Sequence, residues 1–186
     1  MVRRLIPPWV PKANIIAPIS ASARSGLSNP RALMSAFDSS RINFFTNYYS
    51  VSPGMLSITP GKGANYLMAF TDSEDAPLSG GSNYRLRLPA NIPAAIFWSV
   101  TLYDAENSSG LANGQPFPSL GSRDKPARNA DGSTDLYLGS KAPEGKERNW
   151  LATVPGKGYF AILRLYAPTQ AAIDKSWKPG DITKVK

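Results

Sequence analysis

Six side chains in the second half of the chain are of types that could bind a ligand: Trp98, Tyr103, Asp104, Arg123, Arg164 and Tyr166. Arg164 has the most demanding surroundings, because it falls in a run of apolar and aromatic residues that is predicted to be a strand. A buried guanidinium needs a partner, and Asp104 at the end of another predicted strand could supply a bidentate carboxylate. A structural ion pair between two strands is the simpler interpretation, and an anion-binding arginine in a cleft is the alternative.

The chain contains no cysteine and no histidine. This composition excludes disulfides, zinc sites built from Cys or His, Ser-His-Asp and Cys-His catalysis, and proton switches based on imidazole. The chemistries that remain open to the chain use carboxylate, lysine, tyrosine or a serine–lysine pair.

Two short motifs resemble functional ones but lack the context that those functions need. Ser122 and Lys125 match S-x-x-K, yet the accompanying Ser and Lys-Thr-Gly elements are absent and the segment is predicted to be a loop. The stretch 129–133 reads NADGS, which is typical of a tight turn and lacks the spacing of a calcium loop. We therefore assign no catalytic residue, no metal ligand and no cofactor.

The elements that must position the candidate residues are predicted to be mainly strands and turns. Seventeen prolines and fifteen glycines divide the 186 residues into short segments, which suits β-structure better than a helical bundle. The best strand patterns cover residues 66–71, 84–88, 95–103, 134–138 and 159–166. Along FWSVTLYD at 97–104, alternation places Phe97, Ser99, Thr101 and Tyr103 on one side and Trp98, Val100, Leu102 and Asp104 on the other. Shorter strands are expected at 55–58 and 150–153, and a short helix at 169–175. The polar segment 105–133 is predicted to be a long loop, and loops of this length are usually functional or interfacial.

The first part of the chain has a different pattern. Prolines at positions 7, 8, 11 and 18 exclude a continuous helix, so residues 1–27 are expected to form an extended arm. A helix start signal follows at Ser28-Asn29-Pro30, and a periodic apolar stripe predicts an amphipathic helix over 28–52 that packs on the following domain, 53–186. The sequence contains no apolar run long enough for a membrane span and no clear secretory signal, and it does not indicate a compartment.

The basic charge of the protein is concentrated in the arm. The net charge is +8, and residues 1–37 contain basic residues but no acidic one. Nucleic-acid binding is not expected, because basic and aromatic residues are not interleaved along an extended face. An arm of this composition suits docking along a protein partner or a second copy of the chain, through Arg3, Arg4, Trp9 and Lys12.

Seven short sequence phrases, taken together in their order and spacing, indicate a family resemblance. They are TDS at 71–73, PLSG at 77–80, YRLRLP at 84–89, FWSVTLYD at 97–104, NADGS at 129–133, LRLYAP at 163–168 and WKP at 177–179. Over about residues 64–185 the chain resembles the bacterial family named domain of unknown function 1214. The resemblance implies an antiparallel β-sandwich of jelly-roll type and no established activity. Members normally carry a large upstream domain, whereas only the arm and one helix precede residue 64 here.

These observations predict an all-β protein, an antiparallel jelly-roll-like β-sandwich with one N-terminal α-helix and an extended Pro-rich basic arm. The expected function is that of a non-catalytic binding or assembly module, an accessory subunit that docks on a partner through its arm and long loop. The alternative is a hydrolase or a small-ligand domain for a carbohydrate or a carboxylate, with Asp104, Arg123 and Arg164 converging in one cleft.

Overall fold

The computed structural model describes residues 10–11 and 59–185, and the fold is that of this part of the chain. Its strands are, in order, β1 (Val10–Pro11), β2 (Ala64–Ala69), β3 (Asn83–Leu88), β4 (Ala94–Asp104), β5 (Ser119–Gly121), β6 (Thr134–Gly139), β7 (Trp150–Ala152), β8 (Tyr159–Pro168) and β9 (Ile182–Val185). Three short helices complete it: η3 (Ser122–Asp124), η4 (Glu147–Asn149) and α4 (Gln170–Ile173). The predicted all-β class is thereby confirmed, while the arm over 1–27, the helix over 28–52 and the strand at 55–58 lie outside the described residues.

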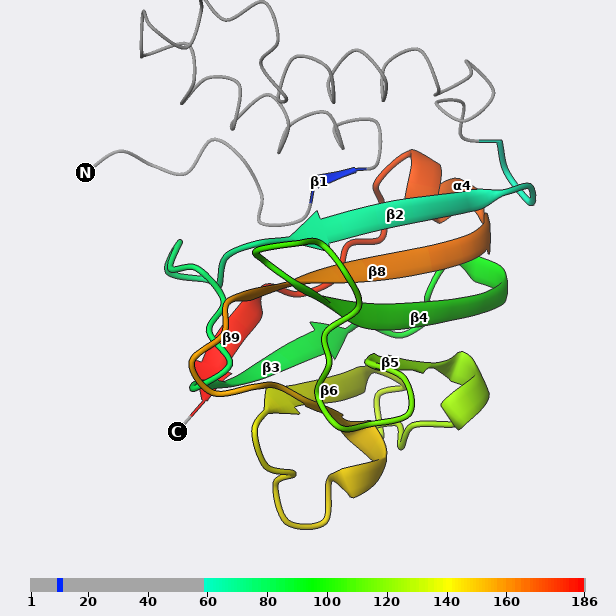
Figure 1. The fold of residues 1–186 in the computed structure, drawn as a ribbon. Helices are drawn as coiled ribbons and strands as arrows, with labels where there is room; N and C mark the ends of the chain where they lie inside the picture. Colours follow the sequence, from blue (N-terminus) through cyan, green and yellow to red (C-terminus); the bar gives the residue numbers. More distant parts are fainter. Residues whose placement is uncertain (1–9, 12–58, 186) are drawn as a thin grey trace, which may run out of the picture. The chain divides into compact units, whose positions relative to one another are not determined.

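Two sheets make up the domain (Figure 1). The first has five strands in the order β1-β2-β8-β4-β5, and the second has four in the order β7-β6-β3-β9. Most neighbours are antiparallel, but β7 runs parallel to β6, with Leu138 opposite Leu151. The expectation of a purely antiparallel sandwich is wrong at this edge, because the chain returns through η4 and enters β7 in the same direction as β6.

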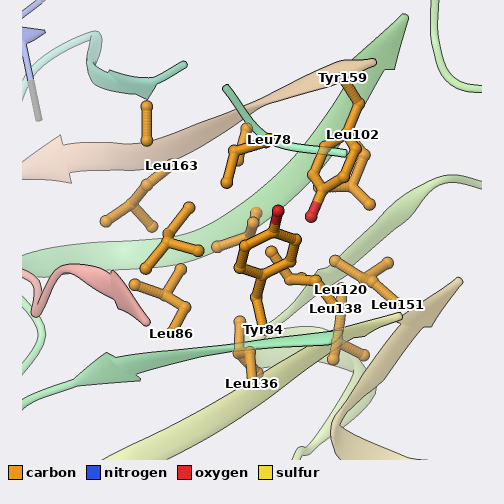
Figure 2. Close-up of a cluster of buried hydrophobic side chains, with 14 of the residues drawn as sticks. Leu78, Tyr84, Leu86, Leu102, Leu120, Leu136, Leu138, Leu151, Tyr159 and Leu163 are labelled. Carbon is orange, nitrogen blue, oxygen red and sulfur yellow. The ribbon is translucent and has the colours of Figure 1, made fainter. Parts of the chain in front are cut away.

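The core lies between the two sheets, where alternate residues of each strand face inward (Figure 2). Strand β3 shows the alternation most clearly: Tyr84, Leu86 and Leu88 are buried, whereas the residues between them are exposed. The phenolic oxygen of Tyr84 accepts a hydrogen bond from the backbone N–H of Ser79 at 3.2 Å, so this fully buried ring keeps a polar partner. One continuous leucine-rich core therefore positions the outward residues of both sheets.

The phrase Pro-Gly-Lys-Gly occurs at 60–63 and again at 155–158, and each copy forms a tight turn. Gly61 and Gly156 have φ values of 72° and 82°, which is the left-handed conformation that follows proline in a type II turn. Each turn leads into a central strand of the five-stranded sheet, β2 in one case and β8 in the other.

The segment 105–133 is more structured than a simple loop. It contributes strand β5 and helix η3, and β5 pairs with β4 in the register that places Gly121 opposite Ser99. A Cβ atom on Gly121 would lie 2.2 Å from the carbonyl oxygen of Trp98, so glycine is needed for this close approach. Strand β5 was not predicted, because three residues carry too little alternation to be read from the sequence.

Candidate functional site

Strand β8 directs Arg164 to the outer face of the five-stranded sheet. Leu163 and Leu165 on either side of it are fully buried in the core, so Arg164 points away from the core. Its neighbours in register are Tyr66 on β2 and Ser99 on β4. The outward side chains of these three strands form what we call the outer face. Its members are Ala64, Tyr66, Met68, Phe97, Ser99, Thr101, Tyr103, Phe160, Ile162, Arg164 and Tyr166.

The guanidinium of Arg164 is held by two hydroxyl groups and two rings. Its Nη1 donates a hydrogen bond to the Oγ1 of Thr101 at 2.8 Å, and its Nη2 donates to the hydroxyl of Tyr103. Its carbon atom Cζ lies 5.3 Å from the ring centre of Tyr66 and 5.4 Å from that of Tyr103. Cation–π attraction and hydrogen bonds therefore fix the head group in one place.

Among the residues that the structure describes, no carboxylate belongs to this arrangement, and the predicted pair between Asp104 and Arg164 is not formed. Asp104 is five residues beyond Ser99, the register partner of Arg164, and it points toward the opposite side of the sheet. Its Oδ2 accepts a hydrogen bond from Nζ of Lys157 at 2.8 Å, and the backbone N–H of Glu106 donates to its Oδ1. The amide of Glu106 and the ammonium of Lys157 thus occupy the carboxylate that was expected to neutralise Arg164.

The electrostatics of the two groups follow from these partners. The hydrogen bond from Lys157 is the largest cause that lowers the pKa of Asp104, and the backbone N–H of Glu106 lowers it further. Partial burial acts to lower the pKa of Arg164, but its hydrogen bond to Tyr103 and the nearby tyrosine oxygens outweigh burial and raise that pKa. Burial is also the main cause that raises the pKa of Tyr166. Arg164 therefore remains a cation, and no carboxylate of the described part of the chain pairs with it.

Stacked aromatic rings extend the site on both sides of Arg164. On one side the ring of Phe97 stacks on that of Tyr166, with centres 3.9 Å apart, and the guanidinium of Arg123 lies 4.3 Å from the centre of Phe97. On the other side the rings of Tyr103 and Phe160 stack at 5.3 Å. Beyond Phe160, the partly exposed ring of Phe70 stacks on it at 5.1 Å. The result is a broad aromatic surface with cations at its centre and margin.

The structure divides the six predicted ligand-binding residues among three places. Tyr103, Arg164 and Tyr166 lie on the outer face, and Arg123 joins them through Phe97. Trp98 points inward, is 6% exposed and lines a cavity at one end of the sandwich. Asp104 pairs with Lys157, so the cleft of Asp104, Arg123 and Arg164 that a hydrolase was expected to use is not assembled.

Two other polar side chains, those of Asn149 and Asp131, have partners within the fold. Asn149 accepts from the backbone N–H of Ala127 at 2.7 Å and donates to the carbonyl oxygens of Ala127 and Asp135 at 2.8 Å, so it ties loop segments to β6. Asp131 caps its own turn at Ser133 and pairs with Arg87. The predicted partner-binding residues Arg3, Arg4, Trp9 and Lys12 lie outside the described residues.

Sequence reasoning missed Tyr66, Phe97 and Thr101, which complete the site around Arg164. Their contribution depends on strand register, because Tyr66 comes from β2 and the other two from β4. The alternation of FWSVTLYD did place Phe97, Thr101 and Tyr103 on one side of a strand. Which strands flank β8 could not be read from that alternation.

Two further observations concern the described residues alone. No group of three His, Cys, Asp or Glu side chains in residues 10–11 and 59–185 is arranged to hold a metal ion. Nor is any helix of this part both long and apolar enough to cross a membrane.

Comparison with solved structures relates the chain to longer proteins. The VPA0106 protein from Vibrio parahaemolyticus is 25% identical, with a TM-score of 0.59, and the match covers 81% of this chain and 36% of that one. An uncharacterized protein from Burkholderia cenocepacia is 14% identical, with a TM-score of 0.42, and the match covers 69% of this chain and 30% of that one. This chain thus spans about a third of the length of each.

The search of curated proteins gave no match. The model of a protein family of unknown function, DUF1214, matches residues 63–170, which include strands β2 to β8 and therefore every residue of the outer face. By this match the chain belongs to the DUF1214 family.

Proposed function

We propose that this domain is a non-catalytic docking module and that its outer face binds a separate protein that presents an acidic side chain to Arg164. One observation carries the proposal: Arg164 is held by Thr101 and Tyr103 and lies beside two tyrosine rings, yet it has no ion pair with any residue that the structure describes. A fixed guanidinium without a carboxylate suits bidentate recognition of one, because little side-chain entropy is lost on binding.

The composition of the outer face supports a protein partner. Tyrosine and arginine are the residue types that most often dominate binding energy at protein interfaces, and phenylalanine is also enriched there. The stacked rings run from Phe97 and Tyr166 across the sheet to Phe160 and Phe70, an extended surface for another folded surface to cover. Arg123 and Arg164 give this surface positive charge, which complements an acidic partner.

The carboxylate is expected to come from another protein. Residues 1–58 contain a single acidic residue, Asp38. The similar Vibrio protein is long enough to contain further domains, since this chain covers 36% of it. The proposal retains the arm with Arg3, Arg4, Trp9 and Lys12 as a second docking element and the jelly-roll connectivity as an expectation.

Site-specific photo-crosslinking tests the proposal. The photoreactive residue p-benzoylphenylalanine replaces Phe70 at the margin of the outer face, or Tyr137 on the outward side of β6 as a matched aromatic control. In cells that naturally produce the protein, the probe at position 70 is expected to crosslink one protein that the probe at position 137 does not. Mass spectrometry identifies it.

Calorimetry with the purified partner then measures the role of Arg164. Arg164→Met is expected to weaken binding at least about tenfold, and Arg164→Lys less, because lysine keeps the charge but loses the planar fork. Arg85→Met, at an exposed arginine of the other sheet, is the control that should bind normally. Equal binding by Arg164→Met would overturn the proposal, and crosslinks to a second copy would assign the face to self-association instead.

A further inference from the structure

A cavity of about 420 Å³ opens at one end of the sandwich. Its walls come from the beginning of β4, from the segment around η3 and from the beginning of β6. Its volume falls in the range of clefts that hold small molecules, roughly 300–1,000 Å³. All its described lining residues belong to the β-sandwich domain, and Arg164 is not among them.

Two nearly buried polar side chains line this cavity and have no hydrogen-bond partner. Trp98 is 6% exposed and Thr134 is 2% exposed, and neither the indole N–H nor the threonine hydroxyl forms a hydrogen bond within residues 10–11 and 59–185. Both atoms still reach solvent-accessible space, since neither is among the enclosed atoms without a partner. Buried groups of this kind usually have partners, so each offers a free hydrogen bond to a molecule in the cavity.

The other two described tryptophans both have an acceptor for the indole N–H, in contrast to Trp98. The indole N–H of Trp150 donates to the carbonyl oxygen of Gly139 at 2.8 Å, and that of Trp177 donates to the carbonyl oxygen of Ala90 at 3.1 Å. Both are less buried than Trp98. The fold therefore satisfies its tryptophan donors elsewhere and leaves one open at the cavity.

The charged residues that line the cavity are all basic. They are Lys125 and Arg128, both exposed and neither in an ion pair, while no Asp or Glu is found among the described lining residues. Two nearby carboxylates have other partners: Asp124 accepts from the backbone N–H of Gly121 at 2.7 Å, and Asp131 accepts from Ser133 and Arg87. The cavity thus combines unused donors with uncompensated positive charge.

Apolar side chains supply the rest of the lining. Ile92 and Phe97 are half-buried, and Ile96 is 69% exposed, which is unusual for an isoleucine. Strand β4 is irregular here, since its pairing with β8 shifts between Ala94 and Phe97. The irregularity accompanies the outward turn of Ile96, and an apolar ligand in the cavity would shield it from water.

We propose that this cavity binds a small monocarboxylate with an apolar body, of the class of aromatic or short aliphatic acids. The carboxylate oxygens accept hydrogen bonds from the indole N–H of Trp98 and the hydroxyl of Thr134, while Lys125 and Arg128 neutralise their charge. The apolar body lies against Ile92, Ile96 and Phe97. Phosphate is the less suitable anion, because it is usually held by several backbone N–H groups at a helix start or glycine-rich loop.

This proposal does not depend on the docking function of the outer face. Its test uses the full chain labelled with nitrogen-15 and follows the indole signal of Trp98, assigned by its loss in Trp98→Phe. The probes are benzoate and hexanoate, with benzamide as the uncharged analogue and phenyl phosphate as the phosphate analogue. Benzoate is expected to shift the Trp98 signal downfield and saturably, because the indole gains an acceptor, whereas benzamide is expected to bind at least about tenfold more weakly.

Substitutions of the exposed residues at the rim of the cavity leave the core intact, so a change in benzoate affinity reports on binding and not on folding. Lys125→Met and Arg128→Met are each expected to weaken benzoate binding about twofold to fivefold, as for exposed charge pairs, and added salt should reduce the difference. Lys184→Met, at an exposed lysine on β9 that does not line the cavity, is the matched control. Equal binding of benzoate and benzamide, tighter binding of phenyl phosphate, or unchanged affinity in both rim variants would each overturn the assignment.

Discussion

The outward sides of the two sheets carry arginines in similar strand patterns, but these arginines differ in burial and in ion pairing. On β3 of the four-stranded sheet, Arg85 and Arg87 alternate with buried residues and are exposed, and Arg87 pairs with Asp131. On β8 of the five-stranded sheet, Arg164 is half-buried beside tyrosine rings and has no carboxylate. The first arrangement is an ordinary solvated face, whereas the second leaves a fixed charge available to another molecule.

The difference shows that the surroundings of an arginine decide what it can do. Side-chain exposures of 46% for Arg87 and 57% for Asp131 leave their pair largely solvated, so it contributes little to stability. Arg164 instead donates its hydrogen bonds to hydroxyl groups, which stabilise its position without cancelling its charge. Five substitutions with measurable effects can separate these roles.

The largest effect is expected in the core that both faces share. Leu163→Ala removes a fully buried side chain beside Arg164 and should lower the free energy of unfolding by about 2–5 kcal/mol. Ile162→Ala, on the outward side of the same strand, should cost only about 1 kcal/mol because the side chain is half-buried. Urea denaturation of both variants measures the difference, and similar losses would show that the outer face is packed as tightly as the core.

The two-sided pattern of the strands could be predicted from the sequence, because side-chain alternation is a local property. FWSVTLYD predicted that Trp98 would lie on the opposite side of its strand from Phe97, and the structure places Trp98 inward and Phe97 outward. The same alternation already placed Asp104 on the side of Trp98. The partner of Asp104 depended on the turn that brings Lys157 to it, which the pattern of one strand cannot show.

The candidate site was less predictable than the fold. Arg164 could be singled out as a charge in an apolar strand, but its position between Tyr66 and Tyr103 depends on β2 and β4 both flanking β8. The cavity could not be predicted either. Lys125 and Arg128 look like ordinary loop residues in the sequence, and only the position of the segment around η3 in the fold places them at the cavity. Long-range strand order and loop placement are not encoded in local periodicity.

A second, smaller effect is expected when the two arginines are compared directly. Arg87→Met should change the free energy of unfolding by no more than about 0.5 kcal/mol, because its ion pair is exposed. Arg164→Met should stay within about 1 kcal/mol of the unsubstituted protein: two hydrogen bonds are lost, but a cation without a carboxylate is replaced by a side chain that packs on aromatic rings. Thermal and urea unfolding of both variants measure this. A loss above about 2 kcal/mol for Arg164→Met would make Arg164 a structural residue and remove the premise of the docking proposal.

The smallest effect concerns the pKa of Asp131, which tests whether the ion pair on the four-stranded side matters at all. This pKa is lowered to about 2, first by the side-chain hydroxyl and backbone N–H of Ser133 and only then by Arg87. A carboxyl whose pKa is lowered in the folded state stabilises the fold above its ordinary pKa of about 4, and this stabilisation is lost as the pH falls through about 2. Ser133→Ala should therefore raise the pKa of Asp131 more than Arg87→Met does.

Carbon-13 NMR titration of the carboxyl groups measures both variants, and Asp174 provides an internal control. Its pKa is lowered by hydrogen bonds from Ser176, so it should stay the same in Ser133→Ala and in Arg87→Met. A larger shift of Asp131 in Arg87→Met would mean that the ion pair, and not the turn, holds this carboxylate. Arg87 would then be fixed by its ion pair and would hold the 129–133 turn against β3. Both arginines would in that case be firmly held, and Arg164 would differ from Arg87 only because it has no carboxylate partner among the described residues.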